Sequence, residues 1–247
     1  MFSGFYTIAS GMMVRQRELD VVGENLVNVQ TPGYKADRMT ISSFQQALLT
    51  RQEALGQQTL GHGDTAAVVD RVQTLHHTGL IKQTGRVYDV AIQGQGYFCL
   101  QGADGQLRLT RNGQFALDEQ GYLVLPGSGR VLGADGPIYL NTGDFEVREN
   151  GAVIRGDGSQ AGVLRIAQPG DTAQLVKEEN GVFRPTGAVQ AAQGYALSQN
   201  SLELSNVDMS QELSQMIEAQ RAFQSCSSAL QIIDAMNRKL TSQFSQL

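Results

Sequence analysis

The two ends of the chain carry apolar residues at the spacing of a coiled coil, and this pattern constrains the fold more than any other feature. Near the start, residues recur at alternating steps of three and four: Phe5, Ile8, Met12, Arg15, Leu19, Val22, Leu26 and Val29, of which only Arg15 is polar. So narrow a seam is typical of a helix that pairs with other helices. Gly4, Gly11 and Gly23 each weaken this helix by roughly 1 kcal/mol relative to Ala, so it needs a partner.

The expected partner is the C-terminal segment, because residues 201–247 contain neither Gly nor Pro. Its seam runs through Met209, Leu213, Met216, Gln220, Phe223, Cys226, Leu230, Ile233, Asn237, Leu240, Phe244 and Leu247, with one three-residue phase slip. Asp208 is the expected N-cap, with Gln211 as its capping-box partner. The outer face of this helix is rich in Ser and Gln. It is either a plain polar surface or a surface that packs against further copies of the helix.

The middle of the chain has a different composition. Between Gly56 and Gly194 lie 24 of the 28 glycines and four of the five prolines. Apolar residues alternate with polar ones around turn pairs such as Asp104-Gly105 and Asn112-Gly113, a pattern that predicts short antiparallel strands. The predicted fold class is therefore α+β. Terminal helices over residues 1–35 and 200–247 pair as a coiled coil, residues 36–75 form an adapter, and residues 76–199 form a β-rich outer domain.

Composition excludes several classes of function. The formal net charge of −5 argues against a nucleic-acid partner, which requires a basic surface. Charged residues make up 17%, against roughly 25% in an average soluble domain, so much of the surface is expected to face other protein. No apolar run is long enough for a membrane helix, and no insertion into a membrane is expected. Cys99 and Cys226 are expected to be buried free thiols.

An enzyme and a stalked binding module are the rival hypotheses. The stretch "GQGYFC" at 94–99 lacks the third glycine and the following helix of a dinucleotide site. His62, His76 and His77 have no ligand partners at zinc-site spacing and are expected at the surface. We therefore expect no catalysis, no cofactor and no metal. A secreted adhesin or carbohydrate-binding module on a coiled-coil stalk would need exposed aromatic side chains, whereas the chain has no Trp.

Three stretches, taken in order, resemble the bacterial flagellar rod and hook family, the axial proteins of the basal body. "ENLVNVQTPGYK" (24–35) resembles that family's N-terminal motif, and residues 89–124 resemble its central β motif. Residues 204–240, which begin "LSNVDMSQEL", resemble its C-terminal motif. The chain departs from the N-terminal motif at Val27 and Gln30, where Ala and a smaller polar residue are common. The resemblance covers both ends and the start of the middle.

The resemblance implies a structural subunit that stacks helically with copies of itself and with other axial proteins of the rod and hook. It also implies export through the flagellar type III apparatus, without a cleaved signal, to a place in the basal body outside the cytoplasm. This agrees with a start that has no basic residue ahead of its apolar stretch. The chain length favours a rod protein, and a hook or hook-associated protein is the alternative.

The resemblance also assigns residues to the turn, the helix cap and the subunit contacts. These are Asn25, Leu26, Asn28, Thr31, Pro32, Gly33 and Tyr34 near the start, and Ser205, Asn206, Val207 and Asp208 before the last helix. The heptad spacing adds the seam residues Leu213, Met216, Phe223, Leu230 and Ile233 as expected subunit contacts. Pro32 disfavours helix at Thr31, and Gly33 can take a positive φ as the chain turns. We expect Gly33→Val to hinder assembly more than it hinders folding of the β domain.

Overall fold

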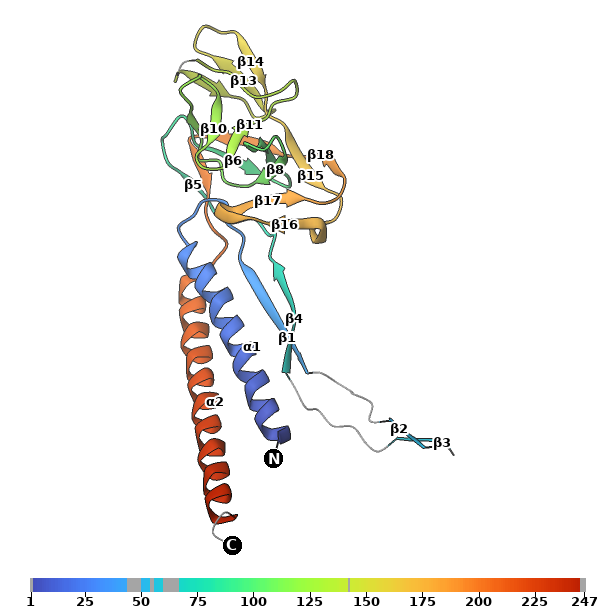
Figure 1. Ribbon diagram of the computed structural model, residues 1–247. Helices are drawn as coiled ribbons and strands as arrows, with labels where there is room; N and C mark the ends of the chain where they lie inside the picture. The colour runs from blue at the N-terminus through green and yellow to red at the C-terminus, as the bar shows by residue number, and fades with distance from the viewer. Residues whose placement is uncertain (1, 44–49, 54–55, 60–66, 142, 245–247) are drawn as a thin grey trace. The chain divides into compact units, whose positions relative to one another are not determined.

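The computed structural model describes residues 2–43, 50–53, 56–59, 67–141 and 143–244 (Figure 1). The chain divides into two compact units. The helical unit contains Met1–Val27, Asp37–Leu75 and Asp208–Leu247, and the β unit contains Asn28–Ala36 and His76–Val207. The structure is α+β, with one helix toward each terminus and a large antiparallel β region between them in the sequence.

In the helical unit, α1 (Phe2–Val27) and α2 (Met209–Phe244) are in contact and run side by side in opposite directions (Figure 1). Helix α1 also contacts strands β1 and β4. Its buried side chains therefore form a wider arc than the predicted seam, and they include Val14, Val21 and Asn25 beside the seam residue Val22. A coiled-coil geometry for the pair stays a prediction.

Helix α2 begins as the sequence predicts. The Asp208 carboxylate accepts hydrogen bonds from the backbone N–H groups of Ser210 (2.9 Å) and Gln211 (3.2 Å), which is the geometry of an N-cap. The expectation that Cys226 is buried is wrong, because its side chain is only half-buried, while Cys99 is fully buried; both are free thiols.

The seam of α2 is covered unevenly. Met216, Phe223, Leu230 and Ile233 are half-buried, whereas Leu213 is 39% exposed. The seam positions Leu240, Phe244 and Leu247 lie outside the side chains that the structure describes.

The remaining part of the helical unit consists of antiparallel strand pairs. Strand β1 (Asp37–Ser43) pairs with β4 (Ala67–Thr74), with a register shift between Thr40 and Ile41. Strand β2 (Thr50–Glu53) pairs with β3 (Gly56–Thr59). The described parts of the expected adapter, residues 36–75, contain these four strands.

The β unit is built around a nine-stranded antiparallel sheet. Its path is β16-β17-β8-β7-β11-β10-β9, and β15 pairs with both β7 and β18. The bounds are β7 Tyr97–Gln101, β8 Leu107–Thr110, β9 Ala116–Leu117, β10 Leu123–Leu125, β11 Gly129–Val131, β15 Ile166–Pro169, β16 Leu175–Lys177, β17 Val182–Pro185 and β18 Val189–Ala191. Two single-turn 3₁₀ helices, Thr172–Gln174 and Glu179–Gly181, flank β16.

Smaller sheets complete the unit. One has three strands in the order β12 (Phe145–Val147), β13 (Ala152–Arg155) and β14 (Gln160–Val163). The other two are the pairs β6 (Val90–Gln93) with β19 (Ala196–Gln199), and β5 (Ile81–Gln83) with β20 (Ser201–Glu203).

Strand β7 is central to the core of the β unit, because both of its faces are buried. Phe98 and Leu100 belong to the larger apolar cluster, and Tyr97 and Cys99 belong to a second cluster on the opposite face. Burial raises the pKa of the Cys99 thiol to about 11. The expected hairpin turn at Asn112-Gly113 is wrong, because the strands on either side of it, β8 and β9, do not pair with each other. A Cβ on Gly113 would lie 1.7 Å from the Val90 carbonyl oxygen, so glycine allows two chain segments to approach closely here.

Candidate functional site

The turn after α1 is folded into the β unit. The Thr31 N–H donates to the Asn28 carbonyl (3.1 Å), and the Thr31 hydroxyl donates to the Asn28 side-chain oxygen (3.1 Å). Gly33 has the expected positive φ, at 68°. Its N–H donates to the Glu203 carbonyl (2.8 Å), and a Cβ on it would lie 2.3 Å from the carbonyl carbon of Arg111. Only glycine fits this position without a shift of the backbone.

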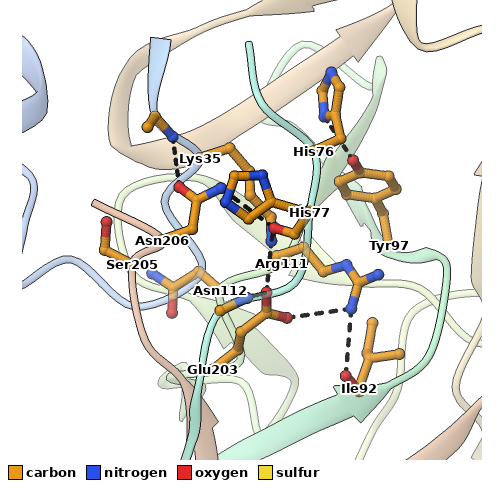
Figure 2. A network of polar contacts seen from close by, with 12 residues as sticks. Lys35, His76, His77, Ile92, Tyr97, Arg111, Asn112, Glu203, Ser205 and Asn206 are labelled. Atoms are coloured by element: carbon orange, nitrogen blue, oxygen red, sulfur yellow. Dashed lines mark hydrogen bonds and ion pairs between the residues drawn. The ribbon is translucent and has the colours of Figure 1, made fainter. Parts of the chain in front are cut away.

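Two residues after Gly33, Lys35 enters a buried network of charges (Figure 2). Its ammonium group is fully buried and donates to the Glu203 carboxylate (2.5 Å) and to the His77 carbonyl (2.8 Å). Burial lowers the pKa of Lys35 from its usual value, and the charge of Glu203 opposes that shift. The Gly79 N–H also donates to this carboxylate (3.0 Å). The carboxylate of Glu203 therefore holds both the Lys35 ammonium and the chain at Gly79.

Arg111 contributes a second cation to the same carboxylate (Figure 2). Its guanidinium is only 4% exposed and donates to Glu203 (3.1 Å), to the Ile92 carbonyl (3.3 Å) and to the Gly94 carbonyl (2.7 Å). It also lies over the ring of Tyr97, with 5.4 Å between the guanidinium carbon and the ring centroid. Its Nε has no hydrogen-bond partner among the described residues. Two buried cations therefore share one buried carboxylate.

Asn206 and Lys177, from two further segments of the chain, bind the residues that directly follow Gly33. The Asn206 side-chain oxygen accepts from the Ala36 N–H (2.7 Å), and its amide donates to the His77 carbonyl (3.2 Å) (Figure 2). The Lys177 ammonium lies 3.8 Å from the centroid of the Tyr34 ring and donates to the Lys35 carbonyl (2.7 Å). The N-terminal and C-terminal motifs of the β unit are thus bound to each other.

The helical unit has its own polar site, centred on Asn25, which is 1% exposed. Its side-chain oxygen accepts from the Asp37 N–H (2.9 Å), and its amide donates to the Asp37 carbonyl (2.8 Å) and to the Glu212 carboxylate (3.2 Å). Arg38 forms an ion pair with Glu212 (3.3 Å) and donates to Gln215 (2.6 Å). One asparagine thereby ties the end of α1 to strand β1 and to the first turns of α2.

The two described histidines, His76 and His77, lie in different environments. His76 is half-buried, contrary to the expectation that it lies at the surface, and its Nδ1 is 2.8 Å from the Tyr97 hydroxyl. Burial raises the pKa of Tyr97 to about 12. His77 is exposed, and His62 lies outside the described residues. Within the described ranges, no group of three or more His, Cys, Asp or Glu residues could hold a metal ion, and neither helix is long and apolar enough to cross a membrane.

The predicted turn and cap residues are divided between the two units. Gly33 and Tyr34 are buried in the β unit, and Asn25 is buried in the helical unit. The half-buried members of the set are Leu26, Asn28, Thr31, Pro32, Ser205, Asn206 and Val207. The Ser205 hydroxyl accepts from the Val207 N–H (3.3 Å).

The four charged residues that organise the two sites were missed at the level of sequence: Lys35, Arg111, Glu203 and Glu212. The available signal was their position. Lys35 directly follows the turn, and Glu203 lies between two leucines just before the "SNVD" stretch. In a chain so poor in charge, an isolated charge in an apolar context indicates a buried pair.

Comparison with known proteins gives three family models in order along the chain. A model described as "Flagella basal body rod protein" matches residues 5–35. The "Flagellar hook protein FlgE/F/G D1 domain" matches residues 91–153, and the "Flagellar basal body rod FlgEFG protein C-terminal" matches residues 198–243. The first match ends at Lys35, and the third includes Glu203.

Whole-length relatives give the same result. The flagellar basal-body rod protein FlgG of Bacillus subtilis is 32% identical, over 97% of this chain and 98% of the relative. The flagellar basal-body rod protein FlgF of Caulobacter vibrioides is 31% identical, over 91% of each chain. The flagellar hook-basal body complex protein FlhO of Bacillus subtilis is 26% identical over the full length of both.

Proposed function

The chain belongs to the flagellar basal-body rod family and is a structural subunit of the rod, and from that premise we propose how its parts serve assembly. Helices α1 and α2 supply the axial core, in which they pair as a coiled coil and pack against other copies. The proposed division is residues 1–35 and 200–247 for the core, 36–75 for the adapter and 76–199 for the outer β domain. The subunit assembles with copies of itself and with other axial flagellar proteins.

The observation that carries this proposal is the amount of apolar surface left on the helices. Tyr6 is 67% exposed and Met13 is 73% exposed on α1, and Ile232 and Met236 are 61% and 60% exposed on α2. Large apolar side chains that stay exposed on long helices indicate a surface that binds other protein. A single chain cannot cover these side chains, whereas neighbouring copies in a tube can.

The register of the two helices supports the coiled-coil part of the proposal. Near one end of the pair, Asn25 bonds to Glu212, and further along a Cβ on Gly11 would lie 3.9 Å from the Cys226 sulfur. The intervals from Gly11 to Asn25 and from Glu212 to Cys226 are both 14 residues. Equal intervals of two heptads are what an antiparallel coiled coil requires, because each heptad brings the same face back to the partner.

The seam residues Met216, Phe223, Leu230 and Ile233, with the more exposed Leu213, are the proposed contacts of α2 within the axial core. The turn and cap residues act indirectly, by fixing the backbone next to the end of α1 and the start of α2. Export through the flagellar type III apparatus, without a cleaved signal, and a final place outside the cytoplasm are part of the same proposal. This part of the proposal rests on membership of the family.

A motility assay with paired variants tests the proposal. The double variant Ile232→Glu/Met236→Glu places two charges on the exposed apolar face of α2, and Gln190→Glu adds a charge at an exposed polar position of the β unit. We expect the double variant to be produced and folded but to give non-motile cells without rods, and Gln190→Glu to restore motility in a deletion strain. Normal rods and swimming with the double variant would contradict the proposal, as would purified chains that form only discrete dimers or trimers.

A further inference from the structure

The charge network of the β unit joins segments that lie far apart in the sequence. Lys35 precedes every strand of the unit, Arg111 follows β8, and Glu203 ends β20, the last strand. Glu203 also accepts the Gly33 N–H through its backbone carbonyl (2.8 Å). All the other strands of the unit therefore precede Glu203, the residue that completes the network, in the sequence.

The network is unbalanced, since two buried cations face a single carboxylate. Loss of Lys35 leaves Arg111 and Glu203 as a neutral pair. Loss of the Glu203 charge leaves two cations buried without an anion, and removing one partner of a buried pair is far more damaging than removing a balanced pair. The three residues are thus unequal, and the carboxylate is the member that the β unit cannot lose.

We propose that Glu203 is the closing residue of the β unit, so that stable folding of the unit is conditional on a negative charge carried by its last strand. Until β20 joins, the buried positions of Lys35 and Arg111 have no anion to compensate them, and the open state, in which water solvates both cations, is favoured. A chain made from its N-terminus onward thus keeps this unit open until almost the whole chain is present. This property belongs to the chain alone and does not depend on assembly into a rod.

Cys99 reports opening of the β unit. Its side chain is fully buried in the unit, so a thiol reagent reaches it only when the unit opens. In full-length protein with Cys226→Ser, Cys99 is the one remaining thiol. When opening is fast relative to labelling, the labelling rate follows the population of the open form.

The experiment compares three variants in the Cys226→Ser protein. Glu203→Gln keeps the shape and a hydrogen-bond acceptor but removes the charge, and we expect labelling of Cys99 to accelerate about 100-fold or more. Lys35→Met removes one cation and should accelerate labelling less than about tenfold. The double variant Lys35→Met/Glu203→Gln restores part of the balance, so it should label more slowly than Glu203→Gln alone.

The ranking of labelling rates is decisive even if Glu203→Gln does not fold. Cys99 would then be fully labelled in Glu203→Gln and still protected in Lys35→Met, which is the expected ranking in its extreme form. The proposal is overturned if Lys35→Met is as reactive as Glu203→Gln. It is equally overturned if the double variant reacts as fast as Glu203→Gln, or if Glu203→Gln reacts within threefold of the parent protein.

Discussion

Gly33→Ala tests whether the turn after α1 is fixed by its contacts inside the β unit. The backbone at this position has φ +68°, and the left-handed region costs an L-residue roughly 1–2 kcal/mol. An added Cβ would also lie 2.3 Å from backbone atoms of Arg111 and Asn112, so the backbone must move. Overpacking of this kind adds about 1–3 kcal/mol. The expected loss of stability is therefore about 2–5 kcal/mol.

Gly85→Ala is the matched control, because Gly85 has φ +73° with no atom within 4 Å of an added Cβ. Its N–H donates to a carbonyl oxygen as that of Gly33 does. The control therefore carries the left-handed strain without the collision and should lose roughly 1–2 kcal/mol. The difference between the two variants isolates the effect of the collision with Arg111 and Asn112.

The assay is thermal unfolding of the protein, with labelling of Cys99 as the measure of how much of the β unit has unfolded. For a chain of this size 1 kcal/mol corresponds to roughly 2–4 °C, so Gly33→Ala should lower Tm by about 10 °C and Gly85→Ala by about 4 °C. Equal shifts for the two variants would refute the packing argument.

The structure also changes the expectation for Gly33→Val. Since Gly33 lies within the β unit, this substitution should impair folding of that unit directly, as well as assembly.

Three further predictions concern the helical unit. Gly11→Cys should form a disulfide with Cys226 under mild oxidation, seen as a faster band on a non-reducing gel, because a Cβ at position 11 lies 3.9 Å from the Cys226 sulfur. Asn25→Leu should destabilise the unit by about 2–4 kcal/mol in denaturant unfolding, because it removes one hydrogen bond to the buried carboxylate of Glu212 and two to the backbone of Asp37 in β1. Asp208→Ala should cost about 1 kcal/mol and reduce helical circular dichroism on heating, through loss of the N-cap.

The first two of these variants have controls in the same unit. Gly23→Cys should give no intramolecular disulfide, because nothing lies within 4 Å of a Cβ there. Gln16→Leu changes an exposed residue of α1 and should alter stability by less than about 0.5 kcal/mol, unlike Asn25→Leu. If Gly11→Cys and Gly23→Cys behave alike on the gel, the register of the two helices is wrong.

Periodicity and composition predicted the elements of the fold, because helices and strands follow from local patterns. The N-cap at Asp208, the turn at Gly33 and the antiparallel β region all follow from short-range chemistry. The buried arc of α1 did not follow, because strands β1 and β4 cover a face that a two-helix seam leaves to solvent. Cys226 is only half-buried, because helix α1 covers one side of its side chain and leaves the other side open.

The sites were harder to predict, because their partners are distant in the sequence. Lys35 and Glu203 lie 168 positions apart, and Asn25 and Glu212 lie 187 apart. No local sequence pattern connects such pairs. They meet only because the folded chain brings its N-terminal and C-terminal segments side by side within each unit. The resemblance to the family singled out Asn25 and Asn206, but it did not show that their side chains bind other parts of the same chain.

Polar contacts suit these positions because they fix register where apolar packing alone tolerates a slip. Strand β20 pairs with β5 so that Ser201 lies opposite Gln83 and Glu203 opposite Ile81. A shift by one residue would turn the Glu203 side chain to the other face of the strand and leave Lys35 without its carboxylate. A buried charge at Glu203 therefore penalises every register of β20 but one.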